Sequence, residues 1–216
     1  ENLDIVIPES LDGYPVKYIE DRAFYNRNDL LSIELPSTLK TIGNESFYGC
    51  GVLSKIEIPD SVESIGEGAF AECLSFVNVA LPDSLTVIAP RLFYGCVSLR
   101  NIYFGSNVTT IGENAFYNCM SIRRFDLPES LTEIGSYAFS LCTGINSIAI
   151  PKAVTELPEG VFFRCYGIDY VELYDTFELL GNNVFTECDE LSDIYYYGTE
   201  EDWNNIEMLP EDFYAP

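Results

Sequence analysis

Phenylalanine recurs in this chain every 23 residues, without a slip over seven intervals. The members of this column are Phe24, Phe47, Phe70, Phe93, Phe116, Phe139, Phe162 and Phe185. A cysteine follows each member after the first by three residues, so all seven cysteines of the chain form a second column. They are Cys50, Cys73, Cys96, Cys119, Cys142, Cys165 and Cys188. Self-similarity at a fixed period of this length is typical of a solenoid, in which each repeat forms one coil.

The unit from Leu30 to Cys50 shows what each coil contains. Ile33 and Leu35 alternate with polar residues, which predicts a half-buried strand, and Pro36 ends it because proline cannot donate to a ladder. A second extended stretch ends at a turn glycine, Gly43. Apolar residues at i and i+3 in the last segment predict a short helical turn. We therefore expect an α/β solenoid of about eight coils, with a parallel strand face, short helical turns and modified terminal coils.

The start of the chain departs from the repeat. Residues 5–8, Ile-Val-Ile-Pro, mimic the strand and its proline, but five additional residues follow before the register resumes. Arg27 stands where later units carry cysteine. We expect a repeat array over residues 1–197 that begins with a partial coil at 1–24, with upstream residues missing.

The end of the chain departs as well. Thr199 and Asp202 have the spacing of a helix start, with Thr199 as the N-cap. Continuing the 23-residue count places Trp203 in the isoleucine column and Met208 in the phenylalanine column. We expect residues 198–216 to be a capping segment in which Trp203 covers the last hydrophobic layer. The alternative is that Trp203 is an exposed platform on which a sugar stacks.

Composition excludes several classes of function. The chain has 35 acidic and 11 basic residues and a net charge of −24, which repels phosphate backbones, so we expect no nucleic-acid partner. It has no histidine, which removes Ser/His/Asp and Cys/His catalysis. No apolar run approaches the ~20 residues that cross a bilayer, so we expect no membrane insertion. We predict no enzyme activity, no metal and no cofactor.

Two sets of residues could carry chemistry, and each has a simpler interpretation. Equivalent cysteines point the same way into the coil, which predicts reduced, packed thiols rather than disulfides or a metal site. Glu34 and Glu57 would stand on adjacent strands at ~4.8 Å, close to the carboxylate separation of retaining glycosidases. Solvated surface charge is the simpler interpretation of that pair.

The repeat unit reads L-x-x-I-x-L-P-x-x-L-x-x-I-G-x-x-A-F-x-x-C and resembles the BspA-like leucine-rich repeats of bacteria, over essentially the whole chain. The resemblance implies a secreted or cell-surface protein with a role in adhesion to host proteins or to other cells. The matching columns are core positions, so the resemblance carries over the architecture and no binding residue.

The exposed side of the strand sheet is the predicted binding surface. The two residues that flank the buried central residue of each strand should face solvent, and aromatic residues and arginine are enriched at interface hot spots. The candidate residues are Asn78, Asn101, Tyr103, Arg124, Asp126 and Tyr170. We expect a monomeric, non-catalytic interaction scaffold that binds a host or bacterial surface protein. A glycan-binding module and a structural spacer for another domain are the alternatives.

Overall fold

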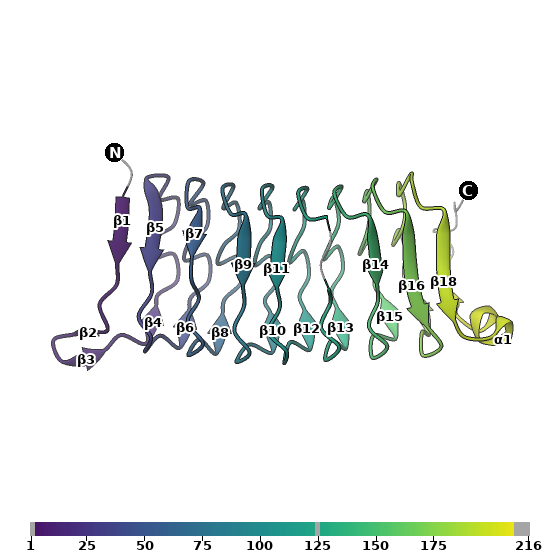
Figure 1. Cartoon of the computed structure of the whole chain (residues 1–216), viewed down its shortest axis with the longest axis horizontal. Coiled ribbons are helices and arrows are strands. Elements are labelled where there is room, and N and C mark those ends of the chain that lie inside the picture. The colour runs from purple at the N-terminus through teal and green to yellow at the C-terminus, as the bar shows by residue number, and fades with distance from the viewer. Residues whose placement is uncertain (1–2, 124–125, 210–216) are drawn as a thin grey trace.

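The computed structural model describes residues 3–123 and 126–209. The chain winds into a row of coils, and the first and last strands of the described residues lie at opposite ends of the long axis (Figure 1). Each repeat adds about one coil, and the coils place short parallel strands in two rows. The predicted solenoid with parallel strands is therefore confirmed.

The first row of strands carries the alternating residues of the repeat. Its strands are β1 (Leu3–Val6), β5 (Leu30–Glu34), β7 (Lys55–Ile56), β9 (Asn78–Ala80), β11 (Asn101–Tyr103), β14 (Ser147–Ala149), β16 (Tyr170–Tyr174) and β18 (Asp193–Tyr197). Parallel neighbours pair residues 23 positions apart, as Ile33 pairs with Ile56. In each strand the residue in the column of Ile33 and Ile56 points into the core, and the residues on either side of it point outward. We call this outward side the strand face.

The second row follows the turn that ends each first-row strand. Its strands are β4 (Tyr18–Ile19), β6 (Thr41–Ile42), β8 (Ser64–Ile65), β10 (Val87–Ile88), β12 (Thr110–Ile111), β13 (Glu133–Ile134), β15 (Glu156–Leu157), β17 (Leu179–Leu180) and β19 (Glu207–Met208). The turn glycine after the strand donates its N–H to the preceding coil, as Gly135 does to the Ile111 carbonyl at 2.7 Å. These bonds hold neighbouring coils at the spacing of a sheet.

The second row is interrupted twice, between β8 and β10 and between β13 and β15. At both places another residue occupies the glycine column. Pro158 has no N–H to donate, and within the described residues no hydrogen bond joins Ala89 to the Ile65 carbonyl. The ladder of the second row is therefore continuous where the residue in this column donates its N–H to the preceding coil.

The third side of each coil is a run of β-turns, so the predicted short helical turns and the α/β class are wrong. Residues two before and two after every phenylalanine of the 23-residue column have positive φ, as Asn114 and Asn118 do around Phe116, and a right-handed helix cannot contain them. The Phe116 N–H donates to Ala138 of the next coil at 2.8 Å, whereas Tyr117 donates back to Asn114 at 3.1 Å. Alternate amides thus join coils together, and the fold is a parallel-strand β-solenoid.

The phenylalanine column forms one continuous stack through the core. Successive rings lie with centroids 5.1–5.8 Å apart and planes within 16° of parallel. The fully buried side chains around this stack are apolar apart from Ser46 and Ser140. Because the described core holds no charged side chain, the acidic residues lie on the turns, the strand surfaces and the ends.

The cysteine column forms a second ladder beside the phenylalanines. All seven thiols are free and buried, as predicted. Each donates to the carbonyl of the phenylalanine one coil earlier at 3.0–3.2 Å, as Cys142 does to Phe116. Burial raises the thiol pKa to about 11 for Cys50 and to about 12 for Cys142 and Cys188. A protonated thiol that is already hydrogen-bonded is a poor nucleophile.

We expect none of the seven thiols of the native protein to react with a thiol-specific disulfide reagent at pH 8, and all seven to react in denaturant. Since the folded pKa values exceed the unfolded value of about 8.5, the thiols contribute stability that is complete below that pH. This stability is lost as the pH rises through the folded values. Absorbance of the released reagent counts the exposed thiols. Rapid labelling of several thiols in the native state would contradict the buried ladder.

The first coil contains the five additional residues that the sequence predicts. Ile5 of β1 pairs with Ile33 of β5, an offset of 28 rather than 23 positions. The additional length forms a hairpin of β2 (Ser10–Leu11) and β3 (Tyr14–Pro15) beyond the edge of the second row (Figure 1).

The last coil also contains five additional residues. The 23-residue count in the sequence analysis did not allow for them. Met208 pairs with Leu180, so it continues the isoleucine column, and the placement of Trp203 in that column is wrong. The five residues form α1 (Glu200–Asn204), which Thr199 caps through the predicted capping box. Trp203 is half-buried against the core and lies edge-on to Tyr196, with ring centroids 5.3 Å apart. This helix, the only one in the described residues, is far too short to span a membrane.

Candidate interaction surface

Three of the predicted site residues lie together at the middle of the strand face. Asn78 on β9 and Asn101 on β11 occupy equivalent positions, and the Asn101 amide donates to the Asn78 Oδ1 at 2.6 Å. Tyr103 pairs in register with Ala80 and is 61% exposed, because the neighbouring side chain is only a methyl group. Arg124 lies outside the described residues.

The remaining two predicted residues, Asp126 and Tyr170, line one hollow in the strand face. Between their coils lies β14, whose outward residues Ser147 and Ala149 are small. The larger side chains of the flanking coils therefore stand above β14 and enclose a volume of about 280 Å³. The predicted residues thus form two groups on the same face rather than one site.

A cluster of tyrosines borders this hollow, and two of its members were missed from the sequence. Tyr174 and Tyr197 stand in the column where most coils carry the strand-ending proline. Since tyrosine keeps the N–H that proline lacks, β16 and β18 pair over five residues, with Tyr174 opposite Tyr197. The loss of proline from this column was the signal for the longer strands.

Ring contacts hold the tyrosine cluster in place. Tyr170 lies edge-on to Tyr195 at 5.5 Å, and Tyr174 stacks on Tyr197 at 5.2 Å. The Tyr197 hydroxyl donates to Glu172 Oε2 at 2.9 Å, and this bond raises the pKa of Tyr197. The cluster therefore presents fixed aromatic faces together with an oriented carboxylate.

A second hollow lies near the start of the strand face and contains the two glutamates weighed as a catalytic pair. Glu34 and Glu57 both line it, and both are exposed. Glu57 forms an ion pair with Lys55 at 2.9 Å. A glycosidase needs one carboxylic acid kept protonated by an apolar pocket, and neither side chain has such surroundings. No group of residues in the described ranges could hold a metal ion.

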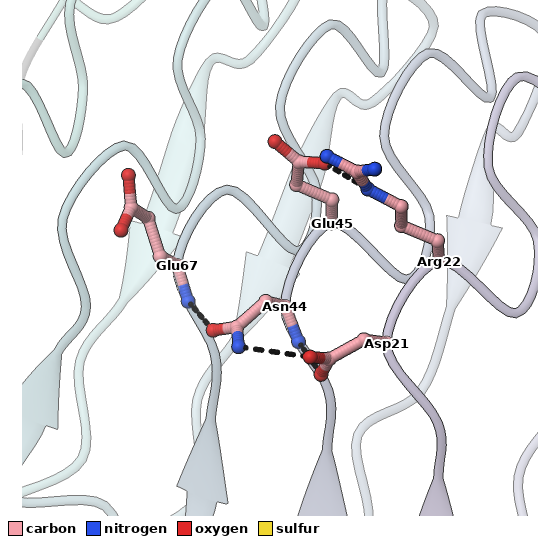
Figure 2. A network of polar contacts seen from close by, with 5 residues as sticks. All are labelled: Asp21, Arg22, Asn44, Glu45 and Glu67. Atoms are coloured by element: carbon pink, nitrogen blue, oxygen red, sulfur yellow. Dashed lines mark hydrogen bonds and ion pairs between the residues drawn. The ribbon is translucent and has the colours of Figure 1, made fainter.

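A polar network on the flank of the first coils joins them side by side. The Asp21 carboxylate accepts the Asn44 backbone N–H at 2.7 Å, and the Asn44 Oδ1 accepts the Glu67 N–H at 2.8 Å (Figure 2). Arg22 and Glu45 form an ion pair beside it at 2.6 Å. Because the Asn44 amide also donates to Asp21, its side chain is committed to joining coils. We interpret this network as structural.

Comparison with known proteins identifies the architecture. The model of the BspA type leucine-rich repeat region matches in six copies over residues 17–135 and 109–206. A leucine-rich repeat protein from Bacteroides ovatus is 27% identical, with a TM-score of 0.66, over 91% of this chain and 64% of its own. One from T. pallidum is 29% identical, with a TM-score of 0.60, over 89% of this chain and 79% of its own.

The pneumococcal vaccine antigen PcpA has the same fold at 21% identity, with a TM-score of 0.65 over 90% of this chain and 60% of its own. The chain therefore spans less than two thirds of the Bacteroides and pneumococcal proteins. No protein with curated function matches the sequence. The repeat matches cover most of the chain, and the protein belongs to the BspA-type leucine-rich repeat family.

Proposed function

We propose that this protein is a non-catalytic interaction scaffold that binds a protein partner through the strand face. The observation that carries the proposal is the set of exposed tyrosines on one face, where Tyr103, Tyr195 and Tyr197 are 51–61% exposed. Tyrosine supplies much contact area at a small entropic cost and is enriched at interface hot spots. The rigid ladder beneath the face keeps that surface preorganised.

We further propose that the protein acts outside the cell or on its surface, as a monomer. Family membership supports a scaffold of this kind, and the PcpA antigen is one relative of the same fold. A net charge of −24 makes copies of the chain repel one another. Glycan binding is the second candidate function. The tyrosines that border the hollow over β14 favour it, whereas Trp203 is half-buried and offers no open surface on which a sugar could stack.

The test is binding of purified extracellular-matrix and bacterial surface proteins, and of a glycan array, to the immobilised protein. We expect a protein ligand whose affinity falls about tenfold or more in the Tyr103→Ala variant, as for loss of a hot-spot residue. The matched control is Tyr18→Ala, because Tyr18 is similarly exposed, at 64%, but lies on the second row.

Equal affinities for the wild type and the Tyr103→Ala variant would contradict the assignment to the strand face. A signal confined to the glycan array would favour the second candidate function.

A further inference from the structure

We propose that the cysteine ladder, the column from Cys50 to Cys188, makes folding depend on the redox state of its thiols. The chain reaches the native fold only while all seven cysteines are reduced, and the fold, in which all seven are free and buried, then keeps them reduced. The inference does not rest on the proposed binding function of the strand face. It comes from the hydrogen bonds of the thiols, their burial and the spacing of the coils.

Each thiol of the ladder has a hydrogen-bond partner inside the core. The Cys73 thiol donates to the Phe47 carbonyl at 3.2 Å, and that carbonyl also accepts the Cys50 N–H at 3.1 Å. The Cys50 thiol donates to the Phe24 carbonyl at 3.1 Å. A disulfide between Cys50 and Cys73 would remove both S–H donors and turn both buried sulfur atoms away from these carbonyls. Close packing of the core therefore opposes a disulfide between neighbouring coils.

Pairs of cysteines in more distant coils are too far apart to be bridged. Neighbouring strands lie about 4.8 Å apart, so a pair two coils apart, such as Cys96 and Cys142, is separated by about 9.6 Å. A disulfide joins Cα atoms that are about 4.4–6.8 Å apart. A mixed disulfide with a small thiol does not fit either, because six of the seven cysteines have no exposed surface. The oxidised forms of the chain are therefore incompatible with the native fold.

The unfolded chain lacks these restraints. An exposed cysteine has a pKa of about 8.5, so at pH 8 roughly a quarter of each thiol is the reactive thiolate. In the folded protein, burial raises the thiol pKa to about 11 for Cys50 and to about 12 for Cys142. Successive cysteines are 23 residues apart, and the entropic cost of closing a loop rises only slowly with its length, so many pairings compete. Unfolding thus makes the same thiols reactive.

The oxidant is a low-molecular-weight disulfide, for which glutathione disulfide is the probe. One cysteine thiolate attacks a sulfur of glutathione disulfide, which forms a mixed disulfide and releases one glutathione thiolate. A second cysteine thiolate attacks the cysteine sulfur of the mixed disulfide, which forms the protein disulfide and releases the second glutathione. Two cysteine thiols are thereby oxidised, one glutathione disulfide is reduced to two thiols, and the two cysteine protons pass to glutathione. A chain that meets this oxidant before it folds is held unfolded until a reductant restores its thiols.

The experiment unfolds the whole chain in urea at pH 8 with glutathione disulfide, or with reduced glutathione as the control, and then removes both urea and glutathione. We expect the native far-ultraviolet circular dichroism that is recovered to be at least about fivefold lower after oxidation than in the control. Dithiothreitol should restore the oxidised sample to the level of the control. Recovery of the native spectrum by a chain whose disulfides persist in mass spectrometry would overturn the proposal.

A second measurement needs no refolding. At the urea midpoint about half of the molecules are unfolded, and only these should react with glutathione disulfide. The native signal that remains should therefore decay to near zero as free thiols are lost, and it should stay constant in reduced glutathione. Loss of thiols from molecules that keep the native spectrum would overturn the proposal, and so would a native signal that persists in glutathione disulfide.

Discussion

Replacing Phe116 with alanine is expected to lower the free energy of unfolding by about 3–5 kcal/mol, the range for deleting a fully buried aromatic side chain. The Phe116 ring stacks on Phe93 at 5.5 Å and on Phe139 at 5.3 Å. A third ring, Phe104, meets it edge-on at 5.9 Å. The cavity would therefore open at the centre of the stack, where backbone ladders on both sides prevent collapse around it.

Urea unfolding followed by far-ultraviolet circular dichroism measures this loss. The control is Phe24→Ala, since Phe24 is half-buried in the first coil and, among the described residues, stacks on the single ring of Phe47. Its cost should be less than half as large. In a solenoid the stability is a sum over neighbouring coils, so similar costs for the two variants would show that the stack does not stabilise coil against coil.

Gly135→Ala should be the second severe substitution, costing roughly 3 kcal/mol or more, at or above the upper end of ordinary overpacking. A Cβ at Gly135 would lie 2.5 Å from the Glu113 backbone nitrogen and 2.7 Å from the Gly112 carbonyl carbon. Backbone cannot rotate aside as a side chain can. The coils would have to separate, and the 2.7 Å bond from Gly135 to Ile111 would lengthen or break.

The chain itself contains the precedent for this prediction. Ala89 occupies the same column, and there the ladder between β8 and β10 is interrupted. Thermal unfolding of Gly135→Ala should show a midpoint lower by roughly 6–12 °C, from 2–4 °C per kcal/mol in a chain of this size. Gly51→Ala is the control, because its Cβ would meet nothing closer than 3.4 Å. Equal thermal unfolding midpoints for Gly135→Ala and Gly51→Ala would contradict the claim that glycine in this column sets the distance between neighbouring coils.

The sequence predicted the solenoid because the residues that recur every 23 positions are the same residues that form the buried core. The column of Phe116 is buried from Phe47 to Phe162, and the column of Cys142 is buried throughout. A side chain that recurs at a fixed interval with no slip therefore has one role in the core. The helical turns were predicted wrongly because apolar residues at i and i+3 fit consecutive β-turns equally well. Tyr137 and Leu141 adopt positive φ, which their residue types do not favour. The local sequence therefore did not reveal the left-handed conformation that excludes a helix here.

The candidate surface was only partly predictable. The repeat showed that Tyr103 and Tyr170 point outward, since alternation in a strand fixes the face. It did not show that Asp126 and Tyr170 share a hollow, because a concavity depends on small residues one coil away, here Ser147 and Ala149. The last coil was misread for a similar reason: five residues can enter as a helix without disturbing the pairing of Met208 with Leu180.

Between the two terminal coils, paired strands keep an offset of 23 residues, so distance along the molecule is proportional to the number of repeats. Each coil contributes about 4.8 Å, the distance between neighbouring strands. Loss or duplication of one period within a gene would change the distance between the two hollows by that step and leave the lining of each intact. Natural variation in repeat number would therefore adjust reach along a partner in equal increments, without redesign of any contact.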